Sequence, residues 1–227
     1  MSSSDGLERS TRSTISKRKA AELKQGKLPL APEPKAKKAK IGRAMPVTTA
    51  TAHSPLDPGD VTWDRKNGMV LFWAGWPSQW YKSEFKEGDT TFNCTEQYMM
   101  YHKAKAFNDE TSMRRIMESA NPRKQKALGR KVEGFSEEEW DRVCDAIVER
   151  GNILKFSQDE RLRRELEATK GLTLVEASPK DARWGIGMAV GDARSRDPSA
   201  WPEGSNRLGK ALMRVRDELL GEGEAAQ

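Results

Sequence analysis

The sequence predicts an α+β fold that is predominantly helical and contains a few short strands. Two observations indicate it. Short apolar runs at 69–73 and 172–176 are followed by turn residues, which is typical of buried strands. The segments between and after these runs open on capping residues and repeat apolar residues with the helical period. With 227 residues, 36% of them hydrophobic and 33% charged, the chain holds one substantial domain plus tails.

Residues 1–60 are predicted to form a disordered basic tail. They contain no aromatic residue and hold 12 Lys and Arg against 6 Asp and Glu, whereas the rest of the chain holds 28 of each. Such a segment has too little apolar surface to fold alone. Its basic clusters at 17–19 and 35–40 match a bipartite nuclear-import pattern, which makes an import receptor a predicted partner. The alternative is an arm that aids solubility or binds nucleic acid without specificity.

The composition argues against a membrane protein, a disulfide-rich protein and a zinc site. No run approaches 18 apolar residues and the N-terminus is polar, so neither a membrane span nor a secretory signal is expected. An intracellular protein is predicted, and the basic clusters favour the nucleus. The chain has only Cys94 and Cys144, and only His53 and His102, which is too few for a disulfide framework or a Cys/His zinc site. Neither a cofactor nor a metal is predicted, although composition leaves a carboxylate-bound Mg²⁺ open.

The folded part is predicted to span residues 61–221, with 222–227 as a frayed tail. Its first strand, Met69–Trp73, leads into a loop with aromatic and polar residues at Ser78–Tyr81. Aromatic side chains on such a loop either stack on the ring of a ligand or fill the core, and the sequence leaves both open.

Capping signals mark the helices that follow. Asn121 precedes a proline, and Ser136 is followed three residues later by Glu139, as in a capping box. Helices are therefore predicted to begin near Asn93, Thr111, Asn121, Ser136, Ser157 and Asn206. Two apolar stripes predict the core: Trp140, Val143, Cys144, Ile147, Gly151 and Leu154 on one helix, and Leu208, Leu212, Val215 and Leu219 on the last.

The stretch from Asn93 to Phe107 is the strongest candidate for chemistry. Glu96 and Lys103 are seven residues apart, so a helix places them at nearly the same azimuth, about 10 Å apart along the axis. Two methionines lie between them. A stripe that starts with a carboxylate and ends with an amine predicts the wall of a partly apolar cleft with one ionisable group at each end.

Ordinary structural explanations exist for the same residues. Asn93 is a candidate N-cap, and Glu96 then fits a capping-box glutamate. Lys103 on a helix surface is most commonly solvated. The glycines at 185 and 187 serve simple turns as well as close approach of the backbone to a ligand.

The start of the last helix is a predicted anion site. Gly204, Ser205 and Asn206 precede it, and Arg207 and Lys210 flank it, so that main-chain N–H groups and two cations face one region. A simple cap with solvated basic residues is the alternative.

Five motifs together resemble one family. They are SQWY at 78–81, TEQYMMYHKAKAF at 95–107, KALGRKVEGF at 126–135, LVEASPKDARWGIG at 174–187 and NRLGKALMRVR at 206–216. In order and spacing they are similar to the NADAR superfamily, also called YbiA-like, over residues 70–220. The resemblance implies a single compact domain that hydrolyses N-glycosidic bonds. Members act on phosphoribosyl intermediates of riboflavin biosynthesis or remove ADP-ribose from modified guanine in nucleic acid.

The resemblance also implies roles for particular residues. Glu96, Lys103 and Asp181 are the implied catalytic residues, with Lys103 attacking C1 of the ribose to form a Schiff base. The implied substrate-binding residues are Gln79, Trp80, Trp184, Gly185, Gly187, Asn206, Arg207 and Gly209. Gln79 stands where many members carry asparagine, which lengthens the reach of the amide. The basic tail favours ADP-ribosylated nucleic acid over a riboflavin intermediate, and a module that binds ADP-ribose without cleaving it is the rival from another class.

Overall fold

The computed structural model describes residues 61–225, so the predicted basic tail and its two clusters lie outside the described residues. Within this range the chain forms six α-helices and five short strands, which confirms a predominantly helical α+β fold. The first element of the described range is β1, which begins at Val61.

A three-stranded sheet holds the two predicted strands at its centre and at one edge. β2 (Met69–Phe72) pairs antiparallel with β1 (Val61–Asp64) and parallel with β5 (Thr173–Glu176). All four residues of β2 are buried, as expected for a central strand with an unbroken apolar run. Trp73, predicted to end this strand, lies beyond it and is 57% exposed.

Three of the five strands are not predicted from the sequence. β1 is one, and β3 (Phe85–Glu87) and β4 (Thr90–Phe92) form a separate antiparallel hairpin. Each has only three or four residues and carries polar side chains, so no alternating apolar pattern marks it.

The helices follow the predicted order. They are α2 (Thr95–Ala106), α3 (Glu110–Met117), α4 (Pro122–Gly129), α5 (Glu137–Gln158), α6 (Glu160–Glu167) and α7 (Arg207–Ala225). The predicted surface loop before α7 contains two short 3-10 helices, η3 (Ala193–Arg196) and η4 (Pro198–Ala200); a third, η2 (Arg65–Asn67), joins β1 to β2.

Two predicted caps are confirmed and two boundaries are corrected. The side chain of Asn121 accepts from Lys124 N, and that of Ser136 accepts from Glu139 N. Ser157 does not begin a helix, because α5 continues through Gln158 and Asp159 caps α6. Helix α7 continues to Ala225, through most of the segment predicted to fray.

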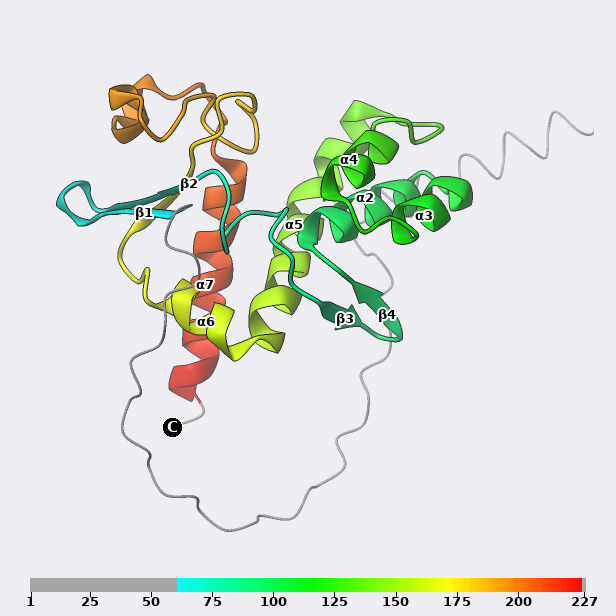
Figure 1. Cartoon of the computed structure of the whole chain (residues 1–227), viewed down its shortest axis with the longest axis horizontal. Helices are drawn as coiled ribbons and strands as arrows, with labels where there is room; N and C mark the ends of the chain where they lie inside the picture. Colours follow the sequence, from blue (N-terminus) through cyan, green and yellow to red (C-terminus); the bar gives the residue numbers. More distant parts are fainter. Residues whose placement is uncertain (1–60, 226–227) are drawn as a thin grey trace, which may run out of the picture. The chain divides into compact units, whose positions relative to one another are not determined.

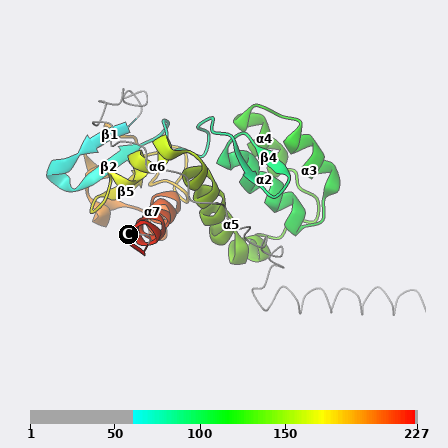
Figure 2. The same cartoon turned by 90° about the horizontal axis from the view of Figure 1, so that it is seen from below.

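Helix α5 forms the centre of the helical layer. It packs against α7 along one side and against α2 along another (Figure 1). Figure 2 shows the same arrangement from below, with α5 between α7 and the group formed by α2, α3 and α4. The predicted apolar stripe on α7 is fully buried, and on α5 every member is buried except Val143, which is partly buried.

Candidate active site

The first turn of α2 is held by the loop at 78–81. The main-chain oxygen of Gln79 accepts from Glu96 N at 3.0 Å and from Thr95 Oγ1 at 3.2 Å. The N-cap position is Cys94, whose side chain makes no capping bond, so the prediction of Asn93 as N-cap is wrong. Asn93 instead donates its side-chain amide to a main-chain oxygen after α3. Because the loop supplies the cap, the carboxylate of Glu96 is not used as one.

Glu96 is a buried carboxylate with a single hydrogen bond. It is 3% exposed; Oε2 accepts from Trp80 Nε1 at 3.1 Å, and Oε1 is sealed from solvent without a partner. Burial raises its pKa to about 7, while the charge of Lys126 and the Trp80 bond oppose the rise. The negative charge of Asp181 adds to it. A carboxyl with a pKa near neutrality can exchange protons at physiological pH.

Lys103 is a buried amine surrounded by aromatic rings and other cations. It is 9% exposed, and its Nζ lies 3.7 Å from the ring centroid of Phe135 and 5.7 Å from that of Trp140. Burial lowers its pKa, and the charges of Arg183 and Arg130 lower it further. Among the described residues no carboxylate lies within ion-pair distance of this amine.

The end of α4 lies beside the stripe that joins the two groups. Gly129 packs directly against the side chain of Met100, where a Cβ would overlap the sulfur. This contact brings Arg130 next to α2, and its charge acts on the pKa of both Glu96 and Lys103. The two ends of the predicted stripe are therefore both buried and face a common neighbour.

Asp181 faces the same region from the loop after β5. Its Oδ1 accepts from the main-chain N–H groups of Arg183 at 3.1 Å and Trp184 at 2.9 Å, which fixes the loop. Its Oδ2 lies 3.6 Å from Nζ of Lys126. The structure thus gathers Glu96, Lys103 and Asp181 around α2, although they come from two distant parts of the chain.

Two of the predicted substrate-binding residues, Asn206 and Gly209, make structural contacts with β5. The side-chain amide of Asn206, which has a left-handed φ of 57°, accepts from Glu176 N and donates to Leu174 O, both at 3.0 Å. It therefore joins α7 to β5, and does not cap α7 as predicted. Gly209 contacts the same strand so closely that a Cβ would overlap the carbonyl oxygen of Leu174.

The two glycines of the loop serve its geometry. A Cβ on Gly185 would lie 2.6 Å from the carbonyl oxygen of Glu176, and Gly187 has a φ of 69°, which favours glycine. In the loop at 78–81, Gln79 is buried, with its Nε2 3.6 Å from Met99 Sδ and its Oε1 unpaired. Trp80 remains 41% exposed, so its ring is available to a ligand.

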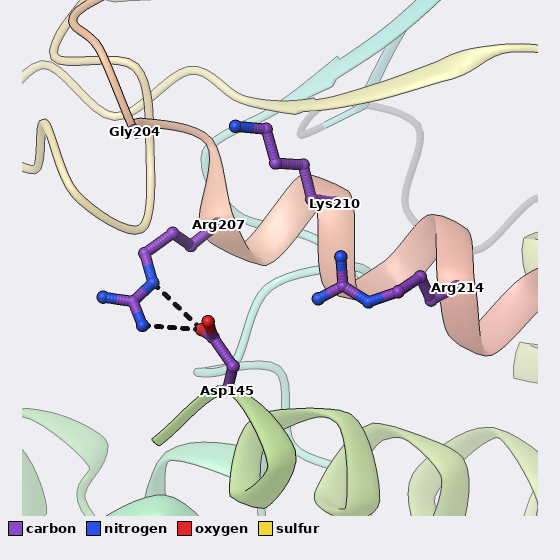
Figure 3. A pocket seen from close by; sticks show the side chains of 5 residues that line it. All are labelled: Asp145, Gly204, Arg207, Lys210 and Arg214. Atoms are coloured by element: carbon purple, nitrogen blue, oxygen red, sulfur yellow. Dashed lines mark hydrogen bonds and ion pairs between the residues drawn. The ribbon is translucent and has the colours of Figure 1, made fainter. Parts of the chain in front are cut away.

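A pocket of about 380 Å³ lies at the start of α7, lined by Asp145, Gly204, Arg207, Lys210 and Arg214 (Figure 3). The guanidinium of Arg207 lies 5.0 Å from the ring centroid of Trp184 and donates to Asp145. Arg214 is paired with Glu149. Lys210 is exposed, and in Figure 3 its side chain points away from Asp145. Among the described residues it forms no ion pair with a carboxylate, so the predicted anion site keeps one cation.

Sequence reasoning missed several charged residues of the site. Lys126 and Arg130 lie four residues apart in one of the motifs, a spacing that puts both on one helix face. This spacing indicates a pair of neighbouring cations. Glu176 ends β5 with its pKa raised to about 8 by burial and by neighbouring carboxylates. Lys155, fully buried on α5, donates to the main-chain oxygens of Trp76 at 2.7 Å and Ser78 at 3.1 Å, and burial lowers its pKa to about 7.

Within residues 61–225, no group of three or more Cys, His, Asp or Glu is arranged to hold a metal ion. In the same part of the chain, no helix combines the length and the apolar character needed to cross a membrane.

Comparison with known proteins places the chain in a family. A model of the NADAR domain matches residues 71–220. N-glycosidase R617 of Acanthamoeba polyphaga mimivirus is 44% identical over 146 residues, which cover 62% of this chain and 85% of that protein. Protein irg-1 of Caenorhabditis elegans is 42% identical over 139 residues, covering 60% and 65%.

The fold is also that of a solved relative. The NMR structure of the Escherichia coli protein YbiA aligns with a TM-score of 0.57 and 25% identity, covering 74% of this chain and 92% of that one. The E. coli protein is named N-glycosidase YbiA. Since the family model matches well over half of the sequence, the chain belongs to the NADAR family of N-glycosidases.

Proposed function

We propose that the protein removes ADP-ribose from ADP-ribosylated guanine in nucleic acid, with Lys103 as the nucleophile. The observation that carries the proposal is the setting of Lys103: a buried amine on an aromatic ring, without a carboxylate partner among the described residues, beside Arg130 and Arg183. The ring face of Phe135 favours the ammonium only weakly, whereas burial and the two guanidinium groups favour the neutral amine. A lysine is nucleophilic only in that neutral form.

The proposed reaction uses both ends of the α2 stripe. The lone pair of Lys103 forms a bond to C1 of the ribose as the C1–N bond to the base breaks. The adduct loses a proton to Glu96 and opens to a Schiff base, which water then hydrolyses to free the lysine. Glu96 suits this exchange because its pKa is raised to about 7 and its Oε1 has no other partner.

The neighbouring residues are proposed to hold the sugar and the base. Asp181 keeps Oδ2 directed toward Lys126, where it can accept from a ribose hydroxyl. The partly exposed rings of Trp80 and Trp184 offer stacking surfaces for a base. Gln79 has an unpaired buried oxygen that can accept one hydrogen bond from the substrate.

Two features favour a nucleic-acid substrate. The net positive charge of the chain belongs entirely to residues 1–60. The pocket at the start of α7 adds Lys210 and Arg207 next to Trp184. Both suit contacts to phosphates, which weaken as salt is raised. The basic clusters at 17–19 and 35–40 also favour import into the nucleus, which holds nucleic acid.

Borohydride trapping tests the nucleophile. Reduction during turnover of an ADP-ribosylated guanine oligonucleotide should fix a sugar adduct on Lys103, located by peptide mass spectrometry. Lys103→Ala should abolish it. Lys105→Ala, an exposed lysine on the same helix, is the matched control and should leave trapping unchanged. An adduct on another residue, or turnover without any adduct, would refute the Schiff base.

A substrate comparison tests the rest. The full chain and a chain lacking residues 1–60 are each incubated with the modified oligonucleotide, the free modified nucleotide and phosphoribosyl pyrimidine intermediates, and base release is measured. We expect the deletion to slow only the oligonucleotide reaction. Release from the pyrimidine alone would favour the riboflavin alternative, and binding of ADP-ribose without release from any substrate would favour a binding module.

A further inference from the structure

Glu176 is held in place more firmly than a residue at a strand end requires. Its main-chain N–H donates to the side chain of Asn206 at 3.0 Å, and its oxygen accepts from Ser178 N at 3.0 Å and Ile186 N at 2.9 Å. Gly185 approaches that same oxygen so closely that only glycine fits. The chain therefore fixes the direction in which this side chain leaves the strand.

The carboxyl group of Glu176 has no partner that explains this arrangement. Its Oε2 is sealed from solvent and makes no hydrogen bond. Among the described residues, only one other carboxyl oxygen is both sealed and unpaired, Oε1 of Glu96. Sealed polar atoms without partners destabilise a fold and are retained mainly where function needs them. Glu176 as a whole stays partly exposed, so a ligand can reach the residue.

Three carboxyl groups face one lysine at this place. The charge of Asp181 raises the pKa of both Glu96 on α2 and Glu176 on β5, and the charge of Glu96 also raises that of Glu176. Lys126 on α4 lowers the pKa of both glutamates and forms an ion pair with Asp181. Lys126 lies 3.6 Å from Oδ2 of Asp181, whose other oxygen accepts two main-chain N–H bonds. Arg130 acts on Glu96 as a second cation, whereas Lys126 is the cation that acts on Glu176, and it is already paired with Asp181. The protonated form of the Glu176 carboxyl is therefore favoured.

The surroundings of Glu176 favour the neutral form of its carboxyl. Burial raises its pKa to about 8, and the charges of Asp181 and Glu96 contribute, whereas Lys126 lowers it. The pKa of Glu96 is raised less, to about 7. The geometry separates the two: the indole of Trp80 donates to Oε2 of Glu96, which favours a carboxylate, whereas Oε2 of Glu176 has no donor. Two carboxyls in different settings suit the roles of base and acid.

We infer that Glu176 is a further catalytic residue, the general acid that protonates the departing base; this rests on the proposed function. As the C1–N bond breaks, its electron pair goes to the base nitrogen, which takes the proton of the Glu176 carboxyl. The lone pair of Lys103 forms the new bond to C1, and Glu176 is left as a carboxylate. The substrate class is therefore an N-glycoside whose leaving base needs a proton. Water in the later hydrolysis step returns that proton.

The test compares two leaving groups in the full-length protein. ADP-ribosylated guanine needs a proton on its departing nitrogen, whereas the pyridinium of nicotinamide mononucleotide leaves as a neutral base without one. Glu176→Gln keeps the size and the hydrogen bonding of a neutral carboxyl but cannot release a proton. We expect it to lower kcat on the guanine substrate about 100-fold at pH 7 and to change kcat on the pyridinium less than about threefold. Glu218→Gln, an exposed glutamate on α7, is the control.

If the wild type does not cleave nicotinamide mononucleotide, a second measurement tests whether Glu176 is the general acid. The wild-type pH profile on the guanine substrate should fall above about pH 8, near the pKa of Glu176, and Glu176→Gln should lose that fall. Equal losses on both substrates, or a variant that keeps the alkaline fall, would overturn the role of Glu176 while leaving the N-glycosidase standing. A wild type that releases no base from either substrate would overturn the proposed ADP-ribosyl-guanine activity, and the role of Glu176 with it.

Discussion

The indole Nε1 of Trp80 donates to Oε2 of Glu96 across 3.1 Å, which joins an exposed loop residue to a buried carboxylate. This bond favours the ionised carboxylate and so lowers a pKa that burial raises to about 7. The same loop therefore acts on Glu96 twice: Gln79 O accepts from its main-chain N–H, and Trp80 lowers the pKa of its carboxyl.

Replacing Trp80 by phenylalanine should therefore move the acidic limb of the pH profile of kcat/KM to higher pH. The variant loses the donor, the pKa of Glu96 rises, and a larger fraction of the enzyme is protonated at pH 6. Base release measured from pH 5 to 9 checks it. Trp73→Phe, at a 57% exposed tryptophan outside the site, should behave as wild type. An unmoved acidic limb would show that Glu96 is not the group titrating there.

Arg130→Gln should move the same limb in the same direction. The charge of Arg130 lowers the pKa of both Glu96 and Lys103, and both must lose a proton before reaction, so its removal raises both values. The effect should shrink as salt is added, because Arg130 is exposed. Lys131→Gln removes the same charge one residue along the chain and serves as the control. Identical profiles for the two variants would contradict a local role for Arg130.

Gly209→Ala should destabilise the protein by roughly 1–3 kcal/mol or more. The added methyl group would overlap the main-chain oxygen of Leu174 and the amide of Asn206, neither of which can move without disturbing β5. Chemical denaturation measures the free energy of unfolding. Gly191→Ala, at a glycine with open space around it, should change that free energy little. If both variants are equally stable, α7 does not pack on β5 as closely as described.

Glu176→Gln should stabilise the protein at pH 8 relative to wild type. The pKa of the carboxyl is about 8 in the folded protein against 4.5 for a free side chain. Between these values the folded state holds a proton that the unfolded state releases, so the wild-type free energy of unfolding falls as pH rises from 4.5 to 8. The glutamine variant lacks this fall, which is worth about 4–5 kcal/mol.

Denaturation of both proteins at pH 5 and pH 8 checks this. The difference between them should be small at pH 5, which is only half a unit above the pKa of 4.5 in the unfolded chain, and should grow toward pH 8. A difference that is the same at the two pH values would mean that Glu176 is ionised in the folded protein.

Local signals account for what the sequence predicts well. The caps at Asn121 and Ser136 and the stripe on α7 depend on residues three or four apart, and the structure bears them out. Glu96 and Lys103 are recognisable as a pair because one helix carries both. The short strands β1, β3 and β4 have no such signal, since pairing with distant segments forms them.

The rest of the site is determined by tertiary packing. Glu176 and Lys126 come from a strand and a helix far apart in the chain, so no spacing connects them. Asn206 has the right chemistry for a cap, yet its amide bonds to two main-chain groups of β5, which compete for the same donor and acceptor. Asn93 does not cap α2 for a similar reason: its side-chain amide donates to Ser119 O, and the N–H of Glu96 donates instead to the main-chain oxygen of Gln79.

Main-chain oxygens of the loop before α2 supply several of the hydrogen bonds that position it. Lys155, Thr95 and the N–H of Glu96 bond to main-chain oxygens of the segment 76–79, and such oxygens are present whatever the side chains are. The side chains at 79 and 80 can therefore diverge among relatives without displacing the helix that carries the acid. Selectivity for a new leaving base can evolve by exchanging those two residues while the reactive groups stay where they are.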